Sequence, residues 1–145
     1  MISDPVPFSL ELGETKSGIT ITGWDTHRFS DVTDPEHPYF NAIYWAADKG
    51  ITKGYPDGTF GIDRACTRGE MMMFLWRYAG KPAPKAVLIS PFKDVPKTHA
   101  FYKAILWAYQ KKVTAGYTSG KNKGKYMIDE NCSRDQVVTF LYKLK

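Results

Sequence analysis

The stretch "DRACTRGEMMMFLWRYAG", residues 63 to 80, decides the fold. A polar segment with a cysteine leads to Thr67, and an apolar, aromatic run follows. The Thr67 hydroxyl can accept a hydrogen bond from the backbone amide three residues on, while the Glu70 side chain can reach back to the Thr67 amide. This reciprocal pattern is a capping box, which marks the start of a helix. The stretch therefore predicts a helix that begins directly after Thr67.

The same order of residue types recurs in "DENCSRDQVVTFLYKLK", residues 129 to 145, where Ser133 and Gln136 take the capping positions. The repeat extends further back, because residues 29–80 align with residues 92–143, with one residue lost before the first helix and four gained in a loop. Matched pairs include Phe29 with Phe92, Asp31 with Asp94, Trp45 with Trp107, Tyr55 with Tyr117, Cys66 with Cys132 and Arg68 with Arg134. The chain is therefore an internal duplication with loop variation.

Each copy predicts a helix, a turn and a second helix. In the first copy, apolar residues recur at helical spacing from Tyr39 to Ala46, and the segment stops at Gly50, a residue that tolerates positive φ. The segment "GYPDGTF", residues 54–60, then supplies Pro, Asp and Gly for a tight turn. We expect a mainly α fold in which two helix-turn-helix repeats share one core.

The expected organisation has four parts. Residues 1–28 form an N-terminal extension, and the alternation of apolar and polar residues within it, around a Thr-Lys-Ser-Gly turn, predicts a β-hairpin. The first repeat occupies residues 29–82 and the second residues 92–145. Residues 83–91, rich in Pro and small side chains, read as a linker.

Composition narrows the possible partners. The chain has 145 residues, of which 43% are hydrophobic and 24% charged, enough to bury one sizeable core. The formal charge of +5 favours an acidic partner, but the Lys and Arg residues are spread along the chain, so we do not expect nucleic-acid binding. No apolar run is long enough for membrane insertion, and the N-terminal stretch lacks the pattern of a signal peptide. Met1 therefore begins either a cytosolic protein or a piece of a longer secreted one.

The first copy resembles an S-layer homology repeat. The resemblance rests on the Phe-x-Asp-Val opening at Phe29, the "GYPDGTF" turn and the Thr-Arg-x-Glu helix start at Thr67, and it covers about 115 of 145 residues. It implies a helical prism, usually built of three repeats, that binds a pyruvylated secondary polysaccharide of the Gram-positive cell wall. The implied role is non-catalytic anchoring at the cell surface, outside the cell, with no cofactor or metal.

The resemblance also implies which residues bind the glycan. The Arg of the Thr-Arg motif contacts the anionic sugar, and the Asp-Gly turn lines the same groove. Apart from the resemblance, Tyr55 and Tyr117 each follow a Gly in a turn, where they could equally stack on a sugar ring or pack structurally. In the second copy, Thr118, Ser119 and Gly120 stand where the Asp-Gly turn is expected, so the first copy should carry the fuller site. The expected glycan-binding residues are Arg68, Asp57, Gly58, Tyr55, Arg134 and Tyr117.

The arginines have an alternative interpretation. Arg68 and Arg134 could be solvated, or could pair with Asp63, Glu70 or Asp135. A positive residue in the first turn of a helix opposes the helix dipole, so its recurrence in both copies favours use as an anion site.

The two cysteines lie one residue before the helix caps, where the family usually has an aliphatic residue that points into the core. The resemblance and the duplication together imply that Cys66 and Cys132 meet and form a disulfide, which an extracellular location permits. The alternative is two buried free thiols that pack as small hydrophobic groups.

The sequence also offers a catalytic interpretation. Cys66 could be a thiolate nucleophile with a histidine as base, the candidates being His27, His37 and His99. However, Cys132 has the same setting, and no histidine recurs at a matching position. Asp57 with Asp63 or Glu70 could be an acid pair, but carboxylates near turns usually serve as caps. We therefore do not expect an enzyme.

The leading alternative function is a protein interaction module that binds another surface protein or a second copy of itself. It would bury an apolar patch where a third repeat is missing, and Met71 to Met73 are candidates for that patch. The tryptophans Trp45, Trp76 and Trp107 are expected in the core rather than at a ligand.

Overall fold

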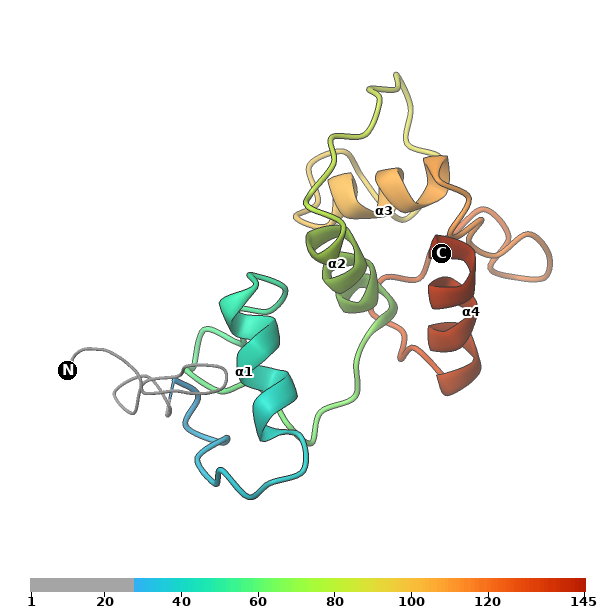
Figure 1. Cartoon of the computed structure of the whole chain (residues 1–145). Coiled ribbons are helices and arrows are strands. Elements are labelled where there is room, and N and C mark those ends of the chain that lie inside the picture. Colours follow the sequence, from blue (N-terminus) through green and yellow to red (C-terminus); the bar gives the residue numbers. More distant parts are fainter. Residues whose placement is uncertain (1–27) are drawn as a thin grey trace. The chain divides into compact units, whose positions relative to one another are not determined.

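The computed structural model describes residues 28–145, and this part of the chain contains four α-helices (Figure 1). They are α1 (Phe40–Asp48), α2 (Arg68–Tyr78), α3 (Tyr102–Gln110) and α4 (Arg134–Leu144). The mainly α fold class is confirmed. The predicted β-hairpin falls on residues 1–27, outside the described part of the chain.

The chain divides into two compact units whose boundaries differ from those of the sequence repeats. The described part of the first unit runs from residue 28 to Asp48 and from Thr52 to Asp63, and it contains α1. The second unit comprises Lys49–Ile51 and Arg64–Lys145, and it contains α2, α3 and α4. The second helix of the first copy therefore belongs to the same unit as the whole of the second copy.

The first unit is held together by a small apolar cluster and by one carboxylate. Phe29, Val32, Phe40, Ile43 and Tyr44 form the cluster. Asp31 accepts hydrogen bonds from the backbone amides of Phe60, Gly61 and Ile62 at 2.8, 2.8 and 3.0 Å. These bonds fasten the turn after α1 to the Phe-x-Asp-Val segment, which explains the Asp of that motif.

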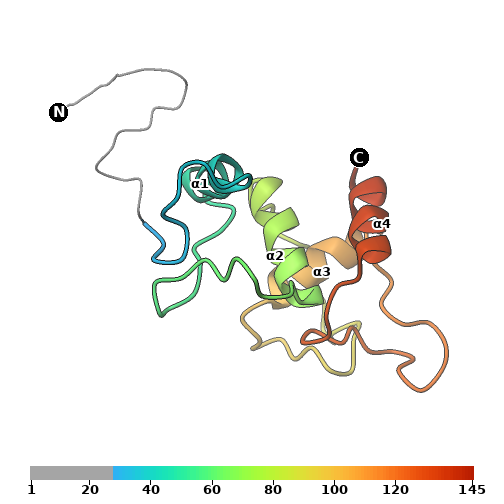
Figure 2. The ribbon, with the colours of Figure 1, turned by 90° about the horizontal axis from the view of Figure 1, so that it is seen from below.

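The second unit contains the larger core, to which both copies contribute. Helix α2 packs against α3, and the two views in Figures 1 and 2 show α4 beside them. The first copy supplies Met71, Met72 and Leu75, and the second copy supplies the remaining residues of this core. Those remaining residues are Phe92, Val95, Tyr102, Ala104, Ile105, Leu106, Trp107, Ala108, Val113, Tyr126, Ile128 and Phe140.

The predicted helix starts are confirmed. Thr67 is the N-cap of α2: its hydroxyl accepts from the Glu70 amide at 3.1 Å, and the Glu70 carboxylate accepts from the Thr67 amide at 3.0 Å. Ser133 is the N-cap of α4, where Gln136 Oε1 accepts from the Ser133 amide at 3.3 Å. The Ser133 hydroxyl also donates to Asp135, which has no counterpart in the first copy because Gly69 stands there.

The turn in the second copy differs from the sequence alignment. In the first copy the Gly58 amide donates to Tyr55 O, and Gly58 O accepts from Ser30. In the second copy the Gly124 amide donates to Tyr117 O, and Gly124 O accepts from Lys93. Gly124 is therefore the counterpart of Gly58, and both have positive φ, 84° and 87°.

The placement of Thr118, Ser119 and Gly120 at the Asp-Gly turn was thus wrong. The four additional residues lie between Tyr117 and Gly124. Lys123, which precedes Gly124, therefore takes the position of Asp57. Sequence alone could not place the gap, because Gly120 and Gly124 are equally good turn residues.

Two expectations about apolar side chains fail. Met71 and Met72 are buried, and Met73 packs against the same core, so these methionines do not form an exposed patch. Trp107 is buried as expected, but Trp45 is 50% exposed. The two tryptophans occupy equivalent positions, but Trp107 belongs to the core that α2 and α3 share, whereas α1 is the one helix in the described part of the first unit.

Among the described residues, none of the helices is both long and apolar enough to span a bilayer.

Candidate functional site

The N-terminus of α2 lies directly against a segment of the second copy, residues 126 to 132. The Arg68 amide donates to Glu130 O at 2.8 Å, and the Gly69 amide donates to Ile128 O at 2.9 Å. The Cys132 amide donates to Cys66 O at 2.8 Å, and an antiparallel bridge joins Thr67 to Asn131. The first amides of α2, which have no partner within the helix, are thus satisfied by carbonyl groups of the other copy.

Gly69 makes this close approach possible. A Cβ atom at Gly69 would lie 2.5 Å from Ile128 Cγ2 and 2.7 Å from Phe101 Cδ2. Such distances are shorter than any ordinary contact between carbon atoms. The first turn of α2 is therefore packed against the second copy without room for a side chain at this position.

Arg68 is the central residue of the site. It is only 4% exposed, and its Nε donates to Tyr126 O at 2.8 Å. Its guanidinium carbon lies 4.8 Å from the ring centroid of Tyr117, 4.5 Å from that of Tyr126 and 5.8 Å from that of Phe140. The Tyr126 hydroxyl donates in turn to Arg68 O at 3.0 Å. Aromatic faces and one carbonyl thus hold the charge of Arg68 in place.

Within residues 28–145, no carboxylate forms an ion pair with Arg68, and no hydrogen bond engages its Nη groups. The expected alternatives, solvation of Arg68 or pairing with Asp63, Glu70 or Asp135, are not what the structure shows. A buried guanidinium without a counterion is unfavourable unless an anion or water completes it. The two remaining donor groups of the planar fork suit a carboxylate or a phosphate.

Tyr117 borders the same site and is half-buried. Its hydroxyl donates to the Glu130 carboxylate. This hydrogen bond and burial raise the pKa of Tyr117, although the charge of Arg68 opposes the shift. The phenol therefore stays neutral at physiological pH and remains a flat, polar surface beside the guanidinium. The loop between Tyr117 and Tyr126 also carries Lys121, Lys123 and Lys125, which makes the surroundings positive.

Of the six predicted glycan-binding residues, Arg68 and Tyr117 lie against each other in the second unit. Asp57, Gly58 and Tyr55 lie in the first unit. There the Asp57 carboxylate accepts from the amide and the hydroxyl of Thr59, so it stabilises its own turn. Arg134 is exposed at the N-terminus of α4.

Three residues of the site were not predicted from the sequence: Tyr126, Phe140 and Glu130. The duplication offered a signal for the first of these, because Tyr126 aligns with Phe60 once the turn glycines are matched, and both amides donate to the Asp of the Phe-x-Asp-Val motif. Neither Phe140 nor Glu130 carries a comparable local signal. Their contribution depends on contacts across the two copies.

The predicted disulfide is wrong. Cys66 and Cys132 are both free, although their backbones are joined by a hydrogen bond. The duplication does bring the two segments together, but the Cys66 thiol is directed to Thr67 O at 3.5 Å. Burial, with smaller contributions from Glu70 and Cys132, raises the pKa of Cys66 to about 11, and burial also raises the pKa of Cys132. Both groups are protonated thiols at neutral pH, which does not support a thiolate nucleophile.

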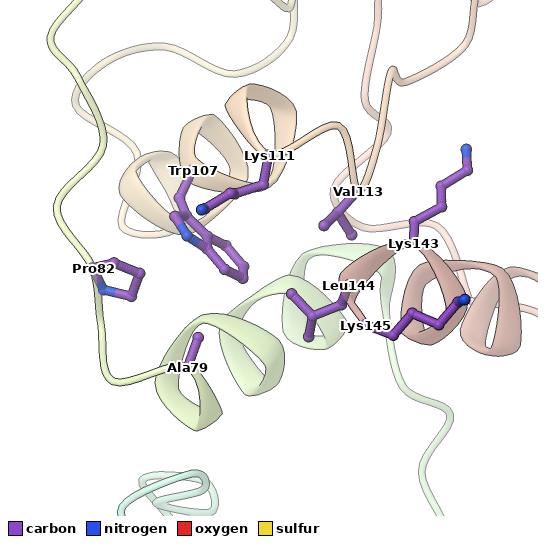
Figure 3. Close-up of a pocket in the computed structure, with 8 residues that line it drawn as sticks. All are labelled: Ala79, Pro82, Trp107, Lys111, Val113, Lys143, Leu144 and Lys145. Carbon is purple, nitrogen blue, oxygen red and sulfur yellow. The ribbon is translucent and has the colours of Figure 1, made fainter.

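A second concave surface lies at the opposite end of α2 (Figure 3). This pocket of about 470 Å³ is lined by Ala79, Pro82, Trp107, Lys111, Val113, Lys143, Leu144 and Lys145. Lys111 is the C-cap of α3 and Lys143 lies in the last turn of α4, where positive charge favours the helix dipole. Lys145 is the C-cap of α4, so helix stabilisation accounts for all three lysines, and this pocket is a weaker candidate than the Arg68 site. Among the described residues, no group of three or more His, Cys, Asp or Glu side chains is arranged to hold a metal ion.

Comparisons with known proteins match both copies of the repeat to one family. The model of the S-layer homology domain matches residues 28–72 and 91–137. The chain is 34% identical to a "Cell surface protein" of Thermoanaerobacter kivui over 81% of the chain and 15% of that protein. It is 31% identical to "Cell surface glycoprotein 1" of Acetivibrio thermocellus, over 67% of the chain and 4% of that protein.

An "Endoglucanase" of a Bacillus species is 32% identical over 75% of the chain and 11% of its own length. The chain thus spans less than a sixth of the length of each of these relatives. The two family matches fall on the two copies found in the sequence and together cover more than half of the residues. The chain therefore belongs to the S-layer homology family.

Proposed function

We propose that this chain is a non-catalytic module that attaches a larger protein to the outside of a Gram-positive cell by binding an anionic, pyruvylated polysaccharide of the wall. One observation carries the proposal: Arg68 is a buried cation with free donor groups and no carboxylate partner among residues 28–145. A pyruvate ketal offers a carboxylate on a sugar ring. The carboxylate fits the guanidinium fork, and the ring can lie against Tyr117.

The setting of Arg68 favours an anion over a neutral sugar. Its guanidinium is already desolvated by Tyr117, Tyr126 and Phe140. Water is therefore removed from the cation when the chain folds, and little of that desolvation cost remains for ligand binding. An incoming carboxylate then forms charge-assisted hydrogen bonds in a site of low dielectric constant. The lysines of the 121–125 loop add long-range attraction for a polyanion.

The relatives support the location. Two of them are named for the cell surface, and the third, an endoglucanase, matches over only 11% of its length, which leaves most of that enzyme outside the shared region. The shared region is thus a module that occurs in proteins with different names and covers only a small part of each. We extend this to the present chain as an extracellular anchoring role that requires no cofactor and has wall polysaccharide as its partner.

Sedimentation with purified walls tests the proposal. The protein should sediment with intact walls and remain in solution with walls stripped of the secondary polysaccharide. Polymer from which the pyruvyl groups have been removed should bind at least about tenfold more weakly, which corresponds to the loss of one charge-assisted pair. Equal binding to polymer with and without the pyruvyl group would refute the anion site. Equal binding to stripped walls would refute polysaccharide anchoring altogether.

Arg68 and Arg134 form a matched pair of variants, because they occupy the same position in the two copies. Arg68→Lys keeps the charge but loses the planar fork, and it should weaken wall binding about tenfold or more. Arg134 is exposed, so Arg134→Ala should weaken wall binding less than Arg68→Lys does. Near-ultraviolet circular dichroism would verify folding, since Arg68 is buried. If Arg134→Ala loses more wall binding than Arg68→Lys, the binding site belongs to Arg134 and the proposed site at Arg68 is wrong.

The alternative function, a protein interaction module, is favoured by a different observation. Helix α4 exposes three large apolar side chains, Val138, Leu141 and Tyr142. This surface does not coincide with the Arg68 site, so the two functions are compatible.

A further inference from the structure

The buried indole of Trp107 carries a hydrogen-bond donor that no described residue uses. Trp107 is 4% exposed, and its Nε1 has no acceptor among residues 28–145. Trp76, in the same unit, shows the usual arrangement, since its Nε1 donates to Pro82 O at 2.9 Å. A buried donor that stays unpaired is unfavourable, and such groups are rare in folded proteins. The Trp107 N–H therefore suits an acceptor that comes from outside the chain.

The same indole lines the pocket of about 470 Å³ at the C-terminal end of α2 (Figure 3). In Figure 3 the nitrogen-bearing edge of the indole is turned toward Pro82 and the end of the Lys111 side chain, which also line the pocket. The Tyr102 hydroxyl is the other buried side-chain atom without a partner within residues 28–145, and Tyr102 is not part of the lining. An unpaired donor and a pocket of ligand size thus coincide at Trp107.

The side chains that line the pocket offer donors and apolar surface but no acceptor. Its polar members are the Trp107 N–H and the ammonium groups of Lys111, Lys143 and Lys145, and its apolar members are Ala79, Pro82, Val113 and Leu144. A sugar needs acceptors for its hydroxyl hydrogens, whereas an ionised carboxylate only accepts. Helix stabilisation accounts for the lysines but not for the indole N–H. The lining therefore favours an anion with an apolar body over a sugar.

We propose that this pocket binds a monocarboxylate with an apolar body. The carboxylate accepts from Trp107 Nε1 and from the Lys111 ammonium, and the apolar part lies against Val113 and Leu144. A free fatty acid and the C-terminal residue of a peptide share this chemistry. All the lining residues belong to the second unit, and Arg68 is not among them, so the site does not depend on the proposed binding of wall polysaccharide.

Lys111 is the side chain that gives a ligand access to the indole donor. Nε1 of Trp107 is shielded from solvent, so an oxygen atom reaches it only when a covering side chain shifts. Lys111 follows Trp107 by one helical turn, is exposed and has a flexible four-carbon stem. When its ammonium group pairs with a carboxylate, the stem can move aside, and the same carboxylate can then accept from both groups.

Binding is measured on the full chain by titration with small acids while the NMR signal of the Trp107 indole N–H is followed. N-acetyl-leucine, a mimic of a peptide C-terminus, should shift this signal with a dissociation constant of about 1 to 10 mM. N-acetyl-leucinamide has the same body without the charge and should bind at least about tenfold more weakly. The Trp76 indole signal should move much less, because that N–H already has Pro82 O as its acceptor. Octanoate, a mimic of a fatty acid, identifies the source of the ligand by whether it binds more or less tightly than N-acetyl-leucine.

Variants assign the binding to the two donors, with the Val113 amide signal as the readout. Lys111→Gln, at an exposed position, should fold and should weaken N-acetyl-leucine binding about fivefold or more. Trp107→Phe keeps an aromatic ring without the N–H and should also weaken it. Tyr102→Phe is the matched control: it removes an unpaired polar atom from a buried aromatic residue of the same helix, outside the pocket, and should leave the affinity unchanged.

Four results would overturn the inference. The first is an absence of any shift of the Trp107 indole signal up to ~50 mM N-acetyl-leucine. The second is equal binding of the acid and its amide, which would leave only apolar contact. The third is an unchanged affinity in Lys111→Gln, and the fourth is inorganic phosphate that binds as tightly as N-acetyl-leucine, which would leave only general attraction to positive charge. Arg68→Lys should not alter the affinity, and a loss of N-acetyl-leucine binding in that variant would place the acid at the Arg68 site instead.

Discussion

Arg68 is held by groups that lie 49 or more positions further along the chain, Tyr117, Tyr126 and Phe140. Local sequence correctly placed it at the start of a helix, because the Thr-Arg-x-Glu pattern is local. It could not show that the residue is buried. Burial results from the aromatic residues of the second copy, and only the three-dimensional arrangement supplies them.

Tyr102 and Tyr126 provide a test of hydrogen bonding at single residues. Both are buried, but the Tyr102 hydroxyl has no hydrogen-bond partner among the described residues, whereas the Tyr126 hydroxyl donates to Arg68 O. Tyr102→Phe should therefore leave the free energy of unfolding unchanged or raise it slightly. Tyr126→Phe should lower it by about 1 to 2 kcal/mol, because Arg68 O loses its donor. Urea denaturation measures both; an equal loss in the two variants would contradict the assignment.

Asp31 should make the stability of the first unit depend on pH. Burial raises its pKa, but hydrogen bonds from the amides of Phe60, Ile62 and Gly61 outweigh this and lower the pKa below its ordinary value of 3.8. Since the folded pKa is depressed, the stabilisation is fully present above pH 3.8 and is lost as the pH falls through the lower folded value.

Asp31→Asn should accordingly lower the stability of the first unit at pH 7 by about 1 to 3 kcal/mol, because an amide oxygen accepts more weakly than a carboxylate. The variant should also lose the acid transition that Asp31 causes. The NMR signals of the Phe60, Gly61 and Ile62 amides, followed from pH 7 to near pH 3, report on this unit. A variant with the same acid sensitivity as the unmodified chain would assign that sensitivity to another group.

At the scale of elements, the first turn of α2 depends on the absence of a side chain at Gly69. In an isolated helix Gly69→Ala would be stabilising by roughly 1 kcal/mol, because alanine is the better helix former. Here the added methyl group would meet Ile128 Cγ2 and Phe101 Cδ2. We therefore expect net destabilisation of about 1 to 3 kcal/mol. Thermal unfolding measures the change. Gly80→Ala is not a fair control, because Gly80 has a φ of 92°, a conformation that alanine rarely adopts. Ala79→Gly at the C-cap of the same helix is the better comparison and should change stability less.

The helices themselves were predicted well and the turn between them was not. Capping boxes at Thr67 and Ser133 depend on side chains within four residues, so they can be read from the sequence. The counterpart of Gly58 in the second copy depends on which backbone groups pair. Gly120 and Gly124 both have positive φ, and only the hydrogen bonds to Tyr117 and Lys93 identify Gly124. The disulfide failed for a related reason, because adjacent backbones do not fix the direction of two thiols.

At the scale of the whole molecule, the repeats of the sequence and the compact units of the structure have different boundaries. Helix α2 belongs to the first repeat by sequence but supplies Met71, Met72 and Leu75 to the core of the second unit. A fragment of residues 92–145, cut at the sequence repeat, should therefore be largely unfolded. A fragment of residues 64–145, cut at the structural unit, should fold cooperatively.

Far-ultraviolet circular dichroism and thermal unfolding of the two fragments measure this difference. Both contain the complete second copy, so the comparison isolates the contribution of residues 64 to 91. A cooperative transition for 92–145 at the temperature found for 64–145 would mean that α2 is dispensable for the second unit.

The mismatch between repeat and unit has a consequence for how such chains can evolve. The second helix of the first copy and the helices of the second copy form one core, so a cut at the repeat boundary divides that core. Exchange of repeats between genes is therefore expected to preserve folding only where the joint falls inside a repeat, between its two helices.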